Sequence, residues 1–151
     1  MRVKEICVTL MALSVVLLAA SQISAQATVK ASFNGYKGVM VGMPMTDART
    51  KLGDPRDKSE TEDYYVYSDS ESVQVLYGPD KTVRVMSINY IGKNAPKPMD
   101  IFGVDIVAKP DGSMNKVVRF PKAGYSISYL RTPGDDPVTM ITVQKIAVSE
   151  Q

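Results

Sequence analysis

The chain has 151 residues, of which 18 are Lys or Arg, 16 are Asp or Glu and none is His, giving a formal net charge of +2. Such a balance gives no general attraction to nucleic acid or to an anionic membrane surface. With no His and a single Cys, the chain also lacks the commonest general bases, nucleophiles and transition-metal ligands. We therefore expect no cofactor, no metal site and no enzymatic activity.

The first 27 residues have the pattern of a secretory signal peptide. A basic start precedes the uncharged segment Ile6–Ala20, and Ala25-Gln26-Ala27 has the small-x-small pattern of a signal peptidase site. A membrane-spanning helix needs about 20 apolar residues, and Gln22 interrupts the apolar segment before that length is reached. We predict that residues 1–27 are removed and that the protein is periplasmic or extracellular. The alternative is an uncleaved membrane anchor.

The single cysteine, Cys7, lies inside this apolar segment. A bacterial lipoprotein carries its cysteine directly at the cleavage point, so a lipid anchor is not expected here. After processing the chain would have no thiol, no disulfide and no membrane span, and its stability would come from packing alone. Removing two basic residues and one acidic residue from a net charge of +2 leaves +1.

Residues 28–41 form a lead-in, and its Tyr36–Val41 portion is apolar enough to contact the core. The next segment, GMPMTDARTKLGDP (Gly42–Pro55), predicts a two-turn helix between two glycines. Three apolar residues recur at the spacing of one helix face: Met45, Ala48 and Leu52. Gly53 can adopt the left-handed conformation that ends a helix, and Pro55 prevents its continuation. A helix this short is unstable alone, so it must pack on a sheet.

Six strand-like segments follow the helix. The first three are Asp63–Ser68, Ser72–Tyr77 and Val83–Tyr90, and the last three are Lys116–Phe120, Tyr125–Arg131 and Val138–Ile146. Short turns within each group of three predict antiparallel pairing, because parallel strands need long crossovers. Between the two groups, Met99–Val104 is expected to form a second short helical turn ending at Gly103.

These elements predict an α+β fold in which a single domain, residues 42–151, has an antiparallel sheet of about six strands with one or two short helices on one face. The two halves, 42–91 and 98–148, resemble each other as helix-plus-three-strand repeats. Leu52-Gly53 corresponds to Phe102-Gly103, and Ser72–Ile88 corresponds to Tyr125–Val143. Either a true duplication or a generic meander that occurs twice would produce this pattern.

The glycine-bracketed segment and the Tyr-rich strand after it resemble the SmpA/OmlA (BamE-like) family, and more widely the helix-plus-sheet fold of the β-lactamase inhibitor protein. The matching residues are structural ones: Gly42, Met43, Leu52, Gly53 and Pro55. They are expected to cap the helix, to make two core contacts and to stop the helix. The resemblance implies a fold but transfers no binding residues. BamE-like proteins are lipoproteins and the inhibitor protein carries disulfides, whereas this chain has neither feature.

Tyrosine is the residue type that most suggests a contact surface. In the first strand Tyr65 and Tyr67 share one face, while Tyr64 and Val66 take the other. A sheet covered by helices on one side buries one of these sets and exposes the other. The candidate partner-binding residues are Tyr65, Tyr67, Tyr77 and Tyr129. The alternative is that tyrosine simply suits a half-exposed sheet.

Six acidic residues gather before and within the first hairpin: Asp57, Glu60, Glu62, Asp63, Asp69 and Glu71. They would suit a calcium site or a basic partner, but no D-x-D-x-D-G pattern occurs. A solvated loop and turn explain them better. No basic stripe accompanies the tyrosines, which disfavours RNA binding.

The sequence thus predicts an exported, non-enzymatic domain that contacts another protein through an exposed sheet face, in envelope assembly or in inhibition of a secreted enzyme. The alternative is a small-ligand carrier with an apolar pocket between sheet and helix. A third hypothesis is a hydrolase using a Ser–Lys pair, either Ser113 with Lys116 or Ser87 with Lys81, although neither pair has a surrounding motif.

Overall fold

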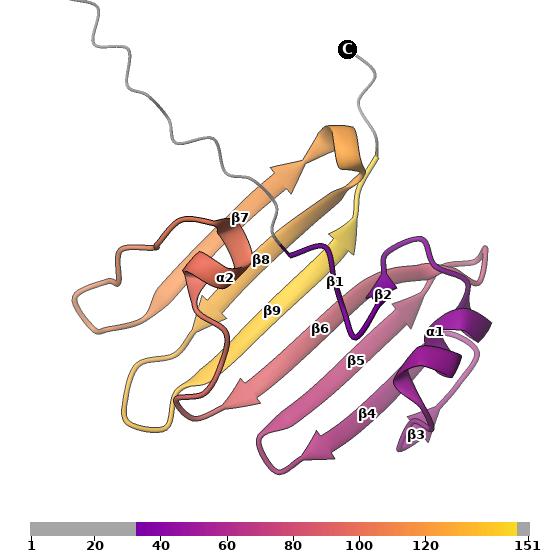
Figure 1. The fold of residues 1–151 in the computed structure, drawn as a ribbon, viewed down its shortest axis with the longest axis horizontal. Coiled ribbons are helices and arrows are strands. Elements are labelled where there is room, and N and C mark those ends of the chain that lie inside the picture. The colour runs from indigo at the N-terminus through magenta and orange to yellow at the C-terminus, as the bar shows by residue number, and fades with distance from the viewer. Residues whose placement is uncertain (1–32, 148–151) are drawn as a thin grey trace, which may run out of the picture.

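The computed structural model describes residues 33–147, so the predicted signal peptide, residues 28–32 and the last four residues lie outside the described part. A seven-stranded antiparallel sheet has the order β3-β4-β5-β6-β9-β8-β7, and a separate two-stranded ribbon pairs β1 with β2 (Figure 1). The fold is therefore mainly β with few helical residues, within the predicted α+β class, and the predicted antiparallel sheet is confirmed.

The first half of the chain contains β1 (Gly35–Tyr36), β2 (Val39–Met40), α1 (Met45–Leu52), β3 (Asp57–Lys58), β4 (Glu62–Ser68), β5 (Glu71–Tyr77) and β6 (Val83–Ile91). The second half contains α2 (Pro98–Phe102), β7 (Met114–Phe120), the 3₁₀ turn Pro121–Ala123, β8 (Tyr125–Arg131) and β9 (Val138–Lys145). Both predicted helices and all six predicted strands are present, with bounds shifted by at most a few residues. The sequence did not predict β3, which is too short to show a periodicity, or the β1–β2 ribbon.

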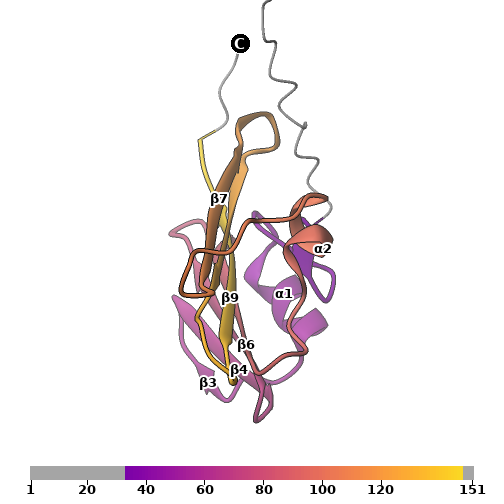
Figure 2. The same ribbon diagram turned by 90° about the vertical axis from the view of Figure 1, so that its left-hand side faces the viewer.

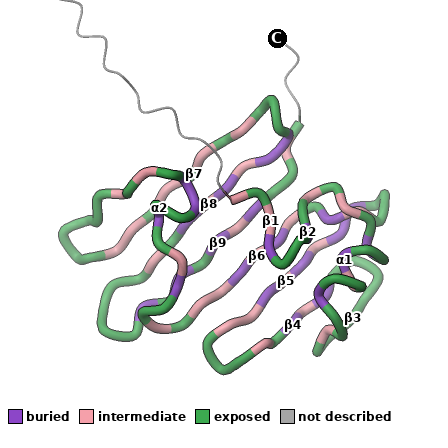
Figure 3. The backbone as a smooth tube through the Cα atoms, viewed as in Figure 1, coloured by how far each residue is buried: buried purple, intermediate pink, exposed green. Residues whose placement is uncertain are grey.

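Both helices and the β1–β2 ribbon lie on one face of the sheet, as the side view shows (Figure 2). Alternate residues of the strands point toward them and form the core, and the buried segments follow this alternation along the central strands (Figure 3). The fully buried side chains include Val73, Val75, Met86, Ile88, Ile127, Ile141 and Val143. From the helical side, Met45, Ala48, Leu52, Ile101 and Phe102 complete this core.

The segment before α1 is held by the start of β6. The Gly42 N–H donates to the Val83 carbonyl at 2.7 Å, and the Val83 N–H donates to the Met43 carbonyl at 2.8 Å. The Met45 N–H then donates to the Lys81 carbonyl at 2.9 Å. Two of the predicted structural residues, Met43 and Leu52, contact the core as expected. The sequence-local motif therefore depends on a contact made about forty residues later in the chain.

Apart from the short outer strand β3, the sheet order is symmetric about the β6–β9 pair. Each half contributes three consecutive antiparallel strands, and the last strand of each half, β6 and β9, meet side by side in the middle. Ser87 lies opposite Thr142 in this central pair, and their hydroxyl oxygens are 3.1 Å apart. A duplicated helix-plus-three-strand unit would give this order, and the duplication stays a prediction.

Candidate interaction surface

The sheet face opposite the helices, here called the open face, is covered by no described element (Figure 2). Its residues are the strand positions that alternate with the core positions. In the central row Gln74 lies opposite Ser87, and Thr142 lies opposite Ser128. Because Ser87 also pairs with Thr142, hydroxyl and amide groups run continuously across four strands.

Exposed apolar side chains lie beside this polar row, chiefly over the second half of the sheet. Ile91 lies opposite Val138, and Leu130 lies opposite Met140 on neighbouring strands. Val117 on β7 is 63 % exposed and Ile91 is 53 % exposed. On the first half, Val66 on β4 is exposed on this face, as is Ile91 at the end of β6, whereas four such residues lie on the second half: Val117, Leu130, Val138 and Met140.

The regularly paired outward residues of the four central strands are uncharged, and the exposed Arg84 lies at the bulge near the start of β6. Along β5, the regularly paired part of β6, β9 and β8, the residues that point to this face are Ser72, Gln74, Leu76, Val85, Ser87, Asn89, Ile91, Val138, Met140, Thr142, Gln144, Ser126, Ser128 and Leu130. None of these carries a charge. Glu62 on β4 and Arg119 on β7 lie on the two flanking strands. An uncharged centre with a charged margin is the composition of a protein-binding patch.

The four predicted partner-binding tyrosines do not lie on this face. Tyr65, Tyr77 and Tyr129 are buried on the helix side, with Tyr65 and Tyr129 only 1 % exposed, so the prediction that these three present a contact surface is wrong. Tyr67 is partly buried, and its hydroxyl donates to the Leu52 carbonyl at 3.0 Å. The physical reason is that α1 packs on the Tyr65 side of β4, which leaves Tyr64 and Val66 on the open face.

A buried ion pair, which the sequence analysis missed, joins α1 to the sheet. Arg49 donates through Nε and Nη2 to the two carboxylate oxygens of Asp63, each at 2.8 Å, and Asp63 is fully buried. The hydroxyl of Tyr77 also donates to this carboxylate at 2.6 Å, and that of Tyr65 donates at 3.3 Å. Asp63 is therefore part of the core and not of the predicted solvated acidic segment.

The pKa values of this cluster follow from its burial and its hydrogen bonds. Burial opposes ionisation of Asp63, but the hydrogen bonds from Arg49 and Tyr77 outweigh burial and hold the pKa of the carboxyl below its ordinary value. Burial raises the pKa of Tyr65 to about 12, and burial together with the bond to Asp63 raises the pKa of Tyr77. These groups keep one charge state near neutral pH, which suits a structural role better than proton transfer.

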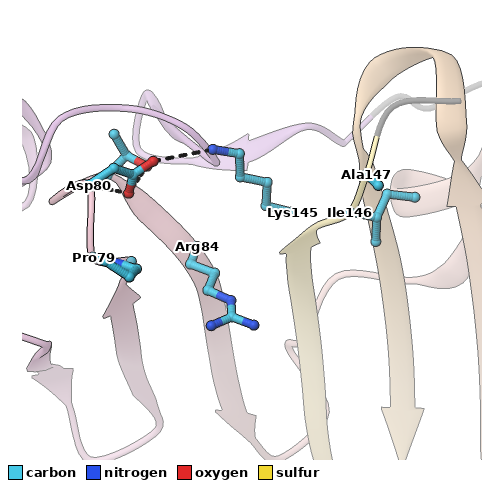
Figure 4. A pocket seen from close by; sticks show the side chains of 8 residues that line it. Pro79, Asp80, Arg84, Lys145, Ile146 and Ala147 are labelled. Atoms are coloured by element: carbon cyan, nitrogen blue, oxygen red, sulfur yellow. Dashed lines mark hydrogen bonds and ion pairs between the residues drawn. The ribbon is translucent and has the colours of Figure 1, made fainter. Parts of the chain in front are cut away.

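Among the cavities of the described residues, two larger ones lie beside the β5–β6 turn and beside α2. The larger, about 460 Å³, lies beside the β5–β6 turn and the end of β9. Lys145 extends there toward Asp80, with Nζ and Oδ2 3.6 Å apart, while Arg84 lies apart from that pair (Figure 4). The smaller cavity, about 300 Å³, lies between the loops that flank α2 and the helix-side face of β7 and β8.

The predicted carrier pocket between sheet and helix is not found at α1, whose inward residues are buried in the core. Within residues 33–147 no helix has the length and apolarity to cross a membrane. No group of three or more metal-ligating side chains gathers in that part of the chain. The predicted Ser–Lys pair of Ser87 and Lys81 is not formed, because Lys81 pairs with Glu60 and Ser87 with Thr142.

No family model, curated protein or solved structure matches the chain. The resemblance to the SmpA/OmlA family therefore stays a prediction that rests on the glycine-bracketed segment.

Proposed function

We propose that this protein is an exported, non-enzymatic domain that binds another protein through the open face of its sheet. Its role would be in envelope assembly or in inhibition of a secreted enzyme. The observation that carries the proposal is the absence of charge from the regularly paired outward residues of four adjacent strands, from Gln74 across Ser87 and Thr142 to Ser128. The exposed Arg84 lies outside this set, at the bulge near the start of β6. Interface centres are depleted of charged residues in the same way.

The composition of the open face favours a separate protein over a second copy of this chain. Obligate homodimers bury mainly apolar surface, since they never expose it to water. Here the central row is made of hydroxyl and amide groups, and the apolar side chains of Ile91, Met140 and Leu130 lie to one side of it. The expected partner is a folded protein with an uncharged, hydrogen-bonding surface that associates and dissociates.

The test is a pair of matched Thr→Arg substitutions on opposite faces. Thr142→Arg places a charge at the centre of the open face, whereas Thr46→Arg places the same charge on the exposed surface of α1. A co-isolated protein is purified, and its affinity for the wild-type chain and both variants is measured. We expect Thr142→Arg to weaken binding by about 100-fold or more, because a charge becomes buried without a partner. Thr46→Arg should bind like wild type.

Oxidative footprinting of the purified complex provides an independent measurement. Met140 on the open face is 38 % exposed, and Met99 on α2 is 46 % exposed, so the two should oxidise comparably in the free protein. We expect the complex to protect Met140 and to leave Met99 reactive. Protection of Met99 alone, equal effects of the two Thr→Arg variants, or concentration-dependent self-association through the open face would each contradict the proposal.

A further inference from the structure

The smaller cavity, here called the basic pocket, lies on the helix side of the sheet in the second half of the molecule. Its walls come from the loop before α2, the loop after α2 and the helix-side residues of β7 and β8. Figure 1 shows these loops lying over the β7–β8 edge of the sheet. Its volume of about 300 Å³ is at the lower end of the range of small-molecule sites.

The charges around the basic pocket are predominantly positive. Lys93, Lys97 and Arg131 line it, and Asp105 is the single acidic residue among the lining residues. The ion pairs Arg49–Asp63, Lys81–Glu60 and Lys145–Asp80 lie away from this pocket. Cations that converge on a concave, partly apolar site attract a small anion, because the low-dielectric walls strengthen the interaction.

Arg131 is held in position by a buried neighbour. Its Nη1 donates to Oγ1 of Thr139 at 3.1 Å, and Thr139 is fully buried on the adjacent strand. A guanidinium has five N–H donors, so this hydrogen bond leaves others for a ligand. A guanidinium binds a carboxylate with two parallel hydrogen bonds, which gives geometric selectivity as well as attraction.

The rest of the basic pocket is apolar and structurally fixed. The Tyr129 ring is buried, and its hydroxyl donates to the Pro96 carbonyl at 3.2 Å, which ties the loop to β8. Ala95 and Pro98 are buried beside it, and Ile106 packs against the core. These groups offer hydrocarbon contact to the uncharged part of a ligand.

We propose that the basic pocket binds a small organic anion, a carboxylate bearing a short hydrocarbon group, with Arg131 as the residue that contacts the carboxylate. The lysines at the rim add attraction, and the Tyr129–Ile106 wall contacts the hydrocarbon. This site lies on the opposite side of the sheet from the open face, so it does not depend on the proposed protein binding.

The test uses three probes with one hydrocarbon chain and different charge: hexanoate, hexan-1-ol and hexylammonium. Binding is followed by amide chemical shifts of the isotopically labelled protein expressed from the full sequence. We expect hexanoate to bind with a Kd of about 1 mM or tighter and to shift amides of β8 and of the loops flanking α2. Hexan-1-ol should bind at least about tenfold more weakly, and hexylammonium should produce no localised shifts.

Two Arg→Gln variants provide the matched comparison. Arg131→Gln removes the proposed anion-binding group and keeps a side-chain amide that can bond Thr139, so we expect about a tenfold or larger loss of hexanoate affinity. Arg84→Gln alters the other cavity and should bind hexanoate like wild type. Lys93→Gln, an exposed change that leaves the core intact, should weaken binding by a smaller factor.

Several results would overturn the basic pocket as an anion site. These are equal binding of the three probes, hexanoate shifts confined to other parts of the chain, no hexanoate binding at millimolar concentration, or equal losses in Arg131→Gln and Arg84→Gln. If Arg131→Gln does not fold, unchanged hexanoate affinity of Lys93→Gln would also count against it.

Discussion

The two halves of the sheet contain similar elements but differ in the length of the helix that covers them and in the pairing of their outer strands. In the first half, α1 has eight residues and the outer strand β4 is flanked by β3. In the second half, α2 has five residues, and β7 has β8 as its one neighbour among the described residues. The exposed apolar side chains of the open face also concentrate on the second half.

Each half has an arginine on the helix side of the sheet, and their surroundings differ. Arg49 forms a two-point ion pair with the buried Asp63, whereas Arg131 bonds the neutral hydroxyl of Thr139. In the first half the cation is neutralised within the protein and fixes α1. In the second half Arg131 bonds a neutral group, which leaves its charge available for the anion binding proposed above. The difference is consistent with a structural role for Arg49 and with the anion-binding role proposed above for Arg131.

The largest expected effect comes from replacing these arginines by methionine. Arg49→Met leaves the fully buried Asp63 without its cation, and we expect a loss of about 3 kcal/mol in the free energy of unfolding. Arg131→Met leaves the neutral, buried hydroxyl of Thr139 without this partner, and we expect a smaller loss of about 1 kcal/mol. Urea unfolding followed by circular dichroism measures both. Equal losses would remove the distinction between the halves.

A smaller difference is expected at the glycines that end the two helices. Gly53 has φ 85° and ψ −157°, a conformation essentially restricted to glycine, whereas Gly103 has φ 67° and ψ 10°, the ordinary left-handed region. No atom lies within 4 Å of a Cβ built on Gly53, so the cost of Gly53→Ala is conformational.

We therefore expect Gly53→Ala to destabilise by about 2 kcal/mol and Gly103→Ala by about 1 kcal/mol. Gly103→Asn should lower the stability less than Gly103→Ala does, because asparagine tolerates the left-handed region. At Gly53, asparagine should be as destabilising as alanine. Thermal unfolding of the four variants measures these differences in stability. A larger loss at Gly103 than at Gly53 would contradict it.

The smallest expected effect is an acid dependence that originates in the first half. The pKa of Asp63 is lower in the folded protein than its ordinary value of 3.8, so its ionised form stabilises the fold above that value. This contribution is lost as the pH falls below about 4. We expect wild type to lose more stability than Asp63→Asn between about pH 7 and pH 3, as measured by urea unfolding. Equal losses of stability in wild type and Asp63→Asn would show that other carboxylates control the acid dependence.

Much of the fold was predictable because local patterns agree with the tertiary structure. Met45, Ala48 and Leu52 recur at helical spacing and are all buried, and Val73, Val75 and Tyr77 alternate in the sequence and face the core. The turns between strands were predictable from their polar, glycine- and proline-containing sequences. Strand pairing across the centre, β6 with β9, was not predictable, since it joins segments about fifty residues apart without a local signal.

The candidate site was less predictable than the fold. Alternation shows that Tyr65 and Tyr67 share a face but does not show which face a helix will cover. Asp63 had the sequence context of a solvated acidic turn, but in the fold Arg49 from α1 and the Tyr77 hydroxyl stabilise it in the interior. The basic pocket brings together Lys93, Asp105 and Arg131 from separate loops and a strand, and no spacing in the sequence relates them.

Local sequence patterns were enough to specify the elements of this protein: a short helix between two glycines, two sets of three antiparallel strands and a second helical turn. These follow from side-chain periodicity and turn chemistry, which act over a few residues. The tertiary structure alone decided which sheet face is open, which arginine is neutralised and where a cavity remains. Those outcomes depend on contacts between distant segments, because a strand offers two chemically similar faces until a helix packs on one of them.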